Sequence, residues 1–296
     1  PLHKIFLMKI TGFTIIRNAL LNDYPVVESI TSILPVVDDM IVVVGDSDDE
    51  TEQLIRSINS PKITIHHSVW DQSLRKGGRV LGVETNKALQ LIPPDSDWAF
   101  YIQADEVVHE KYHAIIRQTA EQYKDDKRVD GLLFNYLHFY GTYDYVGDSR
   151  RWYHKEVRVI RNDSSITAYR DAQGFRRKEQ RIRVKPVDAY IYHYGWVKNP
   201  RQMQTKRRNM TEWWEENASA PNLVGLELFD FAENVDSLDR FTGTHPAVMQ
   251  KRISEQNWDI QLDISKKKFS LKDRVLYWFE KKTGIRLFDF KNYRII

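Results

Sequence analysis

The first third of the chain alternates short apolar runs with stretches in which apolar residues recur at helical spacing. The apolar runs predict strands at residues 13–16, 40–44, 63–66 and 98–102. The stretches between them predict helices at residues 26–34, 52–58 and 79–91. Because strands that alternate with helices of this length form βαβ units, we expect an α/β protein with a mixed, mainly parallel sheet flanked by helices.

The pattern changes in the middle of the chain. One helix is predicted at residues 113–123, and strands at residues 131–136, 157–160 and 189–193. From about Pro200 the chain reads as helical and basic. Ser270 is a typical helix start and Gly284 a typical stop, so we expect a helical C-terminal extension that contains this last helix.

The tetrad Gln103-Ala104-Asp105-Glu106 follows the apolar run that ends at Ile102. Acids at the end of a buried strand lie where open α/β sheets bind ligands. Side-chain alternation puts Gln103 and Asp105 on the same face. A carboxylate there can hold a divalent cation against a diphosphate, although a strand end capped by solvated acids has the same sequence.

Composition narrows the choice of function. A net charge of only +3 argues against a dedicated nucleic-acid binder. The 12% aromatic residues lean toward sugars as ligands, although a large core uses aromatic residues too. The absence of cysteine excludes disulfides and thiolate zinc sites. The sequence has no apolar stretch of membrane-spanning length, and its start, Pro1-Leu2-His3-Lys4, does not have the pattern of a signal peptide. We therefore expect a cytoplasmic protein.

Four segments follow one another in a familiar order: Thr14-Ile15-Ile16-Arg17-Asn18, residues 42–51 around Gly45-Asp46-Ser47, Arg79 to Leu89, and Asp97-Trp98 through Glu106. In this order they resemble the nucleotide-sugar-dependent glycosyltransferases of the GT-A fold, in particular the inverting family 2 and its bacterial polysaccharide branches. The resemblance covers roughly residues 10–200. It implies a UDP- or GDP-sugar donor and a glycan or lipid-linked glycan acceptor in surface polysaccharide or lipopolysaccharide assembly, with no nucleic acid as partner.

The resemblance also implies which residues surround the donor. The nucleotide would lie among Ile16, Arg17, Gly45, Asp46, Ser47, Arg79, Gln103, Ala104 and Asp105. Arg75 and Lys76, beside Gly77-Gly78, could add positive charge. Asp105 and the later His193 would bind a divalent cation, Mn²⁺ or Mg²⁺, although a buried structural histidine explains His193 as well.

Two residues depart from the family pattern. Val44-Gly45 stands where the family has a base-reading acid, which leaves the base open. Gln103 replaces the first acid of the Asp-x-Asp motif. Its amide can still bind ribose hydroxyls but brings no charge, so we expect the cation to be bound weakly or to be dispensable.

An inverting transferase needs one acid near the acceptor hydroxyl. Asp171 is the first candidate, because the family's acid tends to fall after the strand at residues 157–160, and Asp144 and Asp148 compete with it. Each of the three also fits a surface turn. The aromatic residues at 139–145 and 152–153 fit an acceptor platform or a core equally well.

The resemblance divides the chain into a catalytic domain at residues 1–220 and an extension at residues 221–296. The nucleotide-binding half of that domain would be about residues 1–110, and the acceptor half about 111–220. The basic, amphipathic last helix predicts either peripheral contact with the inner face of the cell membrane or docking on the catalytic domain.

Two other functions stay open. Gln103 is compatible with a catalytically degenerate glycan- or nucleotide-binding protein. A nucleotidyltransferase would need a glycine-rich phosphate loop after the first strand, and Arg17-Asn18-Ala19 does not supply one.

Overall fold

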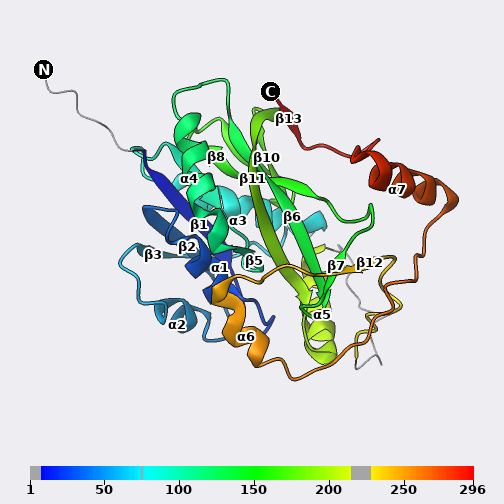
Figure 1. Ribbon diagram of the computed structural model, residues 1–296. Helices are drawn as coiled ribbons and strands as arrows, with labels where there is room; N and C mark the ends of the chain where they lie inside the picture. The colour runs from blue at the N-terminus through cyan, green and yellow to red at the C-terminus, as the bar shows by residue number, and fades with distance from the viewer. Residues whose placement is uncertain (1–7, 75, 215–227) are drawn as a thin grey trace, which may run out of the picture.

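The computed structural model describes residues 8–74, 76–214 and 228–296, and these form an α/β fold around one large sheet (Figure 1). The main path of this 13-stranded sheet runs in the order β3-β2-β1-β4-β8-β6-β11-β10-β9. Its strands are β1 (Ile10–Ile16), β2 (Asp39–Gly45), β3 (Ile63–Ser68), β4 (Trp98–Tyr101), β6 (Gly131–Gly141), β8 (Lys155–Arg161), β9 (Ile166–Tyr169), β10 (Gly174–Arg177) and β11 (Gln180–Val197). The predicted fold class, an α/β protein with a mixed sheet flanked by helices, is confirmed.

The first four strands on this path are parallel, as the βαβ pattern predicts. Strand β8 then runs antiparallel between β4 and β6, and β11 is parallel to β6. Four short strands complete the sheet. They are β5 (Glu106–Val108) and β13 (Tyr293–Ile295), which pair with β11, β7 (Tyr145–Gly147), which pairs with β6, and β12 (Leu238–Arg240), which pairs with β7.

Helices cover both faces of the sheet. The helices of the described residues are α1 (Val26–Ile33), α2 (Thr51–Arg56), α3 (Arg79–Gln90), α4 (His113–Gln122), α5 (Pro200–Trp214), α6 (Gln250–Ser254) and α7 (Leu271–Thr283), with the short helices η1 (Lys76–Gly78), η2 (Glu110–Tyr112) and η3 (Ala247–Met249). One core packs α1, α2 and α4 against the sheet, and the other packs α3 and the β9–β10 hairpin. Because β1 and β2 lie between these two cores, both of their faces are apolar, which is why their sequences read as continuous apolar runs.

The middle of the chain differs from the prediction in several places, and β6, predicted at residues 131–136, runs on to Gly141. Strand β11 has 18 residues, far more than the predicted residues 189–193, and the β9–β10 hairpin was not predicted. Polar and charged residues alternate with buried ones along the first half of β11, so its apolar signal is diluted. Strand pairing across the sheet outweighs that weak local signal.

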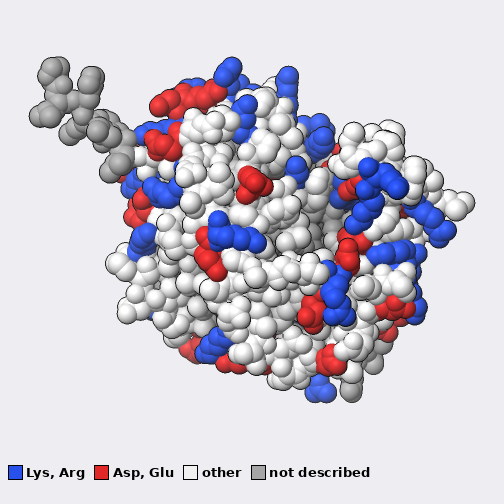
Figure 2. All heavy atoms as spheres, viewed as in Figure 1, with Lys and Arg blue, Asp and Glu red and all other residues white. Residues whose placement is uncertain are grey.

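The C-terminal segment returns to the sheet. Ser270 accepts a hydrogen bond from the Asp273 amide and Gly284 ends α7 with a φ of 69°, so both predicted helix signals are confirmed. Strand β13 then pairs in parallel with β11. Figure 2 shows lysine and arginine side chains gathered around α7, at the right of the view. In the part of the chain that the structure describes, no helix has the length and apolarity needed to cross a bilayer. The predicted boundary at residue 220 stays a prediction.

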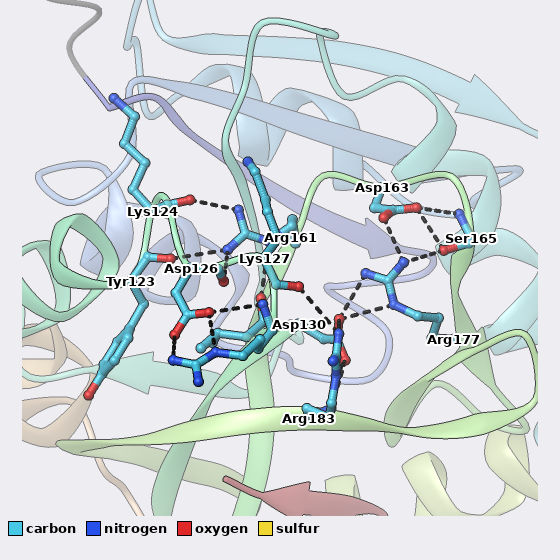
Figure 3. Close-up of polar contacts among 12 residues, drawn as sticks. Tyr123, Lys124, Asp126, Lys127, Asp130, Arg161, Asp163, Ser165, Arg177 and Arg183 are labelled. Atoms are coloured by element: carbon cyan, nitrogen blue, oxygen red, sulfur yellow. Dashed lines mark hydrogen bonds and ion pairs between the residues drawn. The ribbon is translucent and has the colours of Figure 1, made fainter.

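A network of arginine side chains connects the segments around the start of β6 (Figure 3). The buried Asp130 carboxylate accepts hydrogen bonds from Arg177 and Arg183. Burial alone would raise the pKa of Asp130, but these guanidinium groups outweigh it and hold the pKa below its usual value. Arg161 lies over the Trp98 ring and donates to the carbonyls of Tyr123, Lys124, Asp126 and Val129. The network is structural, because it satisfies the backbone of the loop that leads into β6.

Candidate functional site

A pocket of about 350 Å³ opens where β1 and β4 end. Residues 15–18 and 103–105 form its wall on the sheet side, and α5 contributes Lys206, Asn209 and Met210 from the other side. Trp70 and Leu81 line it as well. A pocket at the carboxyl ends of parallel strands is the usual ligand site of an open α/β sheet.

Hydrogen bonds join the end of β1 to the turn after β2. The Asn18 amide group donates to Asp48, and the Asn18 side-chain oxygen accepts from the Asp48 backbone at 2.7 Å. The Arg17 guanidinium donates to the Asp46 carbonyl at 2.8 Å, and the Ser47 hydroxyl accepts from the Asn18 backbone. Two segments that lie about thirty residues apart in the sequence are thereby held side by side at one edge of the pocket.

Gly45 has a clear structural reason to be glycine. A Cβ atom at this position would lie 2.5 Å from the indole nitrogen of Trp70, closer than any stable contact. Its lack of a side chain lets the Trp70 ring cross the end of β2 and form part of the pocket wall.

The tetrad turns back sharply after β4, and Glu106 holds that turn in place. The buried Glu106 carboxylate forms a two-pronged ion pair with Arg158, with both distances 2.8 Å, and accepts a hydrogen bond from Tyr136. It also accepts from the Gln103 backbone. Glu106 is therefore structural, and its contacts fix where Gln103 and Asp105 stand.

Asp105 faces two cationic or polar partners from other elements. Its Oδ2 atom lies 3.3 Å from the Lys206 ammonium of α5 and 3.6 Å from Nε2 of His193 on β11. Burial would raise the pKa of Asp105, but Lys206 and His193 outweigh it and the pKa lies well below its usual value. For Lys206, burial acts in the opposite direction and would lower the pKa. Tyr24 and Asp105 outweigh burial and raise the pKa above its ordinary value, so the group stays an ammonium ion.

His138 on β6 controls which nitrogen of His193 carries a proton. Nε2 of His138 lies 2.7 Å from the Tyr153 carbonyl, which can only accept, so this nitrogen carries hydrogen. Burial, followed by the effect of His193, lowers the pKa of His138 well below its usual range. Its Nδ1 is therefore an acceptor, and Nδ1 of His193, 3.1 Å away, is the donor. With Nδ1 of His193 engaged in this way, its Nε2 is the nitrogen that faces Asp105.

This arrangement suits a cation that is shared with a bound diphosphate. Among the described residues no three His, Asp or Glu side chains form a complete metal site, but Asp105 and His193 converge. Magnesium-like cations commonly use one or two protein ligands and take the rest from phosphates and water. The hydrogen bond from His193 to His138 is the kind of outer contact that orients a metal-binding histidine. Lys206 holds the same carboxylate oxygen, so ammonium and cation would share Asp105.

The structure places most of the predicted nucleotide-binding residues in or beside the pocket. Ile16, Arg17, Gln103, Ala104 and Asp105 line it. Gly45, Asp46 and Ser47 lie directly behind Arg17, Asn18 and Trp70. Arg79 is exposed at the start of α3 and is not part of the pocket wall. Arg75 and Pro1-Leu2-His3-Lys4 lie outside the described residues.

The three candidate acids lie in different surroundings. Asp171 follows Arg170 at the β9–β10 turn, and the Arg170 carbonyl approaches α3 so closely that a Cβ on Gly82 would lie 2.2 Å away. Gly82 follows Leu81, which lines the pocket, but Asp171 itself is not one of the lining residues. Asp144 is exposed just past the end of β6.

Asp148 has several partners from the C-terminal part of the chain. It accepts hydrogen bonds from Ser237 and Tyr277 and pairs with Lys267. Burial acts to raise its pKa, but these partners together hold the pKa below its usual value. These contacts explain Asp148 as an anchor for α7.

The aromatic residues at 139–145 belong to two buried clusters. Phe139, Tyr143, Tyr192 and Tyr194 pack together in one, and Tyr140 and Tyr145 pack with Phe229 and Phe231 in the other. Of the two interpretations of these residues, an acceptor platform or a core, core packing therefore accounts for them.

Sequence reasoning did not find Lys206, Asn209, Met210 or His138. The first three recur at helical spacing on α5, so they were recognisable as one face of a helix, but which surface that face meets depends on the tertiary structure. His138 stands in an apolar strand, where a polar side chain marks either a buried hydrogen bond or a ligand.

No model of a known protein family matches the chain, and no curated protein matches it. Several solved structures are similar in part. Staphylococcus aureus TarS residues 1–349 in complex with UDP is 16% identical, with a TM-score of 0.40 over 69% of this chain and 64% of that one. Another structure of S. aureus TarS is 14% identical with a TM-score of 0.39 over 69% of this chain, which spans 39% of that chain.

Another similar structure is glucosyl-3-phosphoglycerate synthase from Mycobacterium tuberculosis with Mn²⁺, UDP and phosphoglyceric acid. It is 17% identical, with a TM-score of 0.30 over 44% of this chain and 43% of that one.

Proposed function

We propose that the protein is a glycosyltransferase that moves a sugar from a nucleoside diphosphate donor, a UDP- or GDP-sugar, to a glycan or lipid-linked glycan acceptor. The observation that carries this proposal is the pocket at the ends of β1 and β4, where Arg17, Lys206 and Asp105 converge. Its volume of about 350 Å³ lies in the range of small-molecule sites. The resemblance of the four sequence segments to GT-A enzymes supports the same function.

The leaving diphosphate carries the charge that transfer of the sugar must stabilise. Lys206 is a buried ammonium ion on the pocket wall, and the Arg17 guanidinium lies at the other side. Fixed cations in a partly enclosed site stabilise such charge more strongly than water does, because they need not reorient during the reaction. In this proposal both side chains bind the diphosphate oxygens.

Asp105 and His193 would hold a divalent cation, Mn²⁺ or Mg²⁺, beside the diphosphate. When bound, the cation supplies additional positive charge to the leaving group. The hydrogen bond to His138 engages Nδ1 of His193 and leaves its Nε2 to face the cation beside Asp105. Because Lys206 already compensates Asp105, we expect nucleotide binding to persist, though more weakly, without the cation.

For the acceptor we keep the inverting mechanism and Asp171 as first candidate for the base, with Asp144 and Asp148 as alternatives. The support for Asp171 is that its turn packs against α3, the helix that contributes Leu81 to the pocket. In contrast, Asp148 already has ionic partners. A product in surface polysaccharide or lipopolysaccharide assembly remains part of the proposal.

The first test is thermal stabilisation by a panel of nucleoside diphosphates, with Mn²⁺ or with EDTA. A ligand that binds only the folded protein raises the melting temperature, so the stabilising nucleotide identifies the donor base. Asp105→Asn should reduce the shift, whereas Asp125→Asn, at an exposed position, should not. Release of nucleoside diphosphate from the matching sugar donor then shows transfer or hydrolysis.

Other outcomes favour the other functions. Nucleotide binding without release of diphosphate would favour a degenerate binding protein, to which Gln103 points. Stabilisation by a nucleoside triphosphate alone would favour a nucleotidyltransferase. No stabilisation by any nucleotide would contradict the proposed donor site.

A further inference from the structure

Helix α7 carries its apolar stripe on the outside. Leu271, Val275 and Trp278 recur at intervals of four and three residues, so they share one face, and their exposed fractions are 81%, 64% and 60%. A helix docked on a core normally buries such a stripe. Here the stripe faces water.

The opposite side of α7 is firmly attached to the rest of the molecule. The Tyr277 hydroxyl donates to Asp148 at 2.6 Å, and Glu280 pairs with Arg150 at 2.7 Å. Arg286, just beyond the helix, donates to the carbonyls of Arg150 and Trp152. These polar contacts fix the rotation of the helix and so hold the apolar stripe outward.

The segment after α7 continues the exposed apolar surface. Phe288 is 87% exposed and Phe290 is 71% exposed, and Ile285 is exposed beside them. Phe288 also has a φ of +55°, which is uncommon for a bulky residue. Single exposed apolar residues are ordinary, but several in one segment mark an interaction surface.

Positive charge surrounds this surface. Residues 266–296 contain ten Lys and Arg against three Asp and Glu, whereas the whole chain contains 44 against 41. The remainder of the chain is therefore net negative, and the last segment is strongly basic. Lys272, Arg274 and Lys282 are exposed on the same helix, α7.

We propose that the outer face of α7, together with Phe288 and Phe290, binds the surface of an anionic lipid bilayer. The apolar side chains would enter the boundary between headgroups and acyl chains, and the lysines and arginines would contact anionic headgroups. The charge distribution favours this occupant over a second copy of the chain, because two such basic faces repel each other. The protein thus binds as a peripheral protein, with α7 lying along the membrane.

Sedimentation with vesicles tests this surface directly. Wild-type protein should sediment with vesicles of phosphatidylcholine and phosphatidylglycerol in equal parts, and much less with phosphatidylcholine alone. Trp278→Glu should lower the partition coefficient at least about tenfold, because it removes an inserted aromatic ring and adds a negative charge. Leu91→Glu, at an exposed leucine of another region, is the matched control and should bind normally.

A second pair of variants tests how much positive charge contributes to vesicle binding. Lys282→Glu should lower binding to the mixed vesicles at least about fivefold, which is the effect of one lysine at an anionic surface. Lys127→Glu makes the same charge change in an exposed loop before β6 and should leave binding unchanged. Thermal melts should match the wild type for all four variants, because each position is exposed.

Three results would overturn the proposal. They are failure of the wild-type protein to bind mixed vesicles, equal binding by Trp278→Glu, and sedimentation velocity showing a dimer that Trp278→Glu converts to a monomer. The last result would make this face an interface between copies of the chain. Vesicle binding needs no sugar donor, so its outcome is separate from that of the proposed transferase activity.

Discussion

Replacing Lys206 with methionine tests how the pocket balances the negative charge of the Asp105 carboxylate. The side chain keeps its approximate length, but the ammonium group 3.3 Å from Asp105 Oδ2 and 2.9 Å from the Gly195 carbonyl is lost. Among the residues that the structure describes, His193 at 3.6 Å is then the ion-pair partner left to the Asp105 carboxylate.

The size of the effect follows from the geometry. Two unit charges 3.3 Å apart attract by about 5 kcal/mol at an effective dielectric constant of about 20, before desolvation is subtracted. A hydrogen bond to a charged group contributes about 1.5–3 kcal/mol net. If Lys206 binds the diphosphate, Lys206→Met should therefore weaken UDP or GDP binding about 10- to 150-fold.

The cation should reverse part of this loss. Without Lys206 the Asp105 carboxylate is free to bind Mn²⁺, and the metal can supply the positive charge that the ammonium gave. We expect the ratio of the Kd in EDTA to the Kd in Mn²⁺ to be larger in Lys206→Met than in the wild type.

Isothermal titration calorimetry with the stabilising nucleotide, in EDTA and in Mn²⁺, measures both quantities. Lys127→Met removes one exposed lysine elsewhere and serves as control. Unchanged affinity of Lys206→Met in EDTA would refute the role of Lys206 at the diphosphate. An equal loss in EDTA and in Mn²⁺ would refute the shared use of Asp105.

Three further predictions concern other buried groups. His138→Phe should weaken Mn²⁺ binding in the presence of nucleotide about 10- to 100-fold, because His193 loses the acceptor that fixes its tautomer, and electron paramagnetic resonance of Mn²⁺ measures this. Burial raises the pKa of Glu156 from 4.5 to about 8, so the folded protein holds a proton that the unfolded chain releases. Stability should therefore fall by up to about 1.4 kcal/mol per pH unit as the pH rises from 4.5 toward 8, and Glu156→Gln should remove this slope in urea unfolding. Asp130→Asn should cost about 2–3 kcal/mol of unfolding free energy at neutral pH, an effect that shrinks in acid as the wild-type carboxylate is protonated, while nucleotide affinity stays unchanged.

The sequence determined the parallel half of the sheet almost completely. Strands β1, β2, β3 and β4 and the helices between them lie within about three residues of their predicted bounds. For β1, β2 and β4 the reason is that a strand buried on both faces is apolar along most of its length, whereas β3 is an edge strand with no buried residue. The polar residues that end β1 and β4 are also recognisable in the sequence, so Arg17 and the tetrad that begins at Gln103 were predicted as ligand positions. The start and end of α7 were predictable for a similar reason, since Ser270 and Gly284 act through local backbone geometry.

Only the tertiary structure decided how the pocket is completed. Lys206 and His138 come from elements far along the chain from Asp105, and nothing in their local sequence states which surface they meet. The same holds for α7, whose apolar stripe gives the same spacing whether it faces a core or water. Its rotation is set by Asp148 and Arg150, which lie more than a hundred residues earlier in the chain. Periodicity is a local property and partner choice is a long-range one, and this is why the sequence located the site while the fold supplied its chemistry.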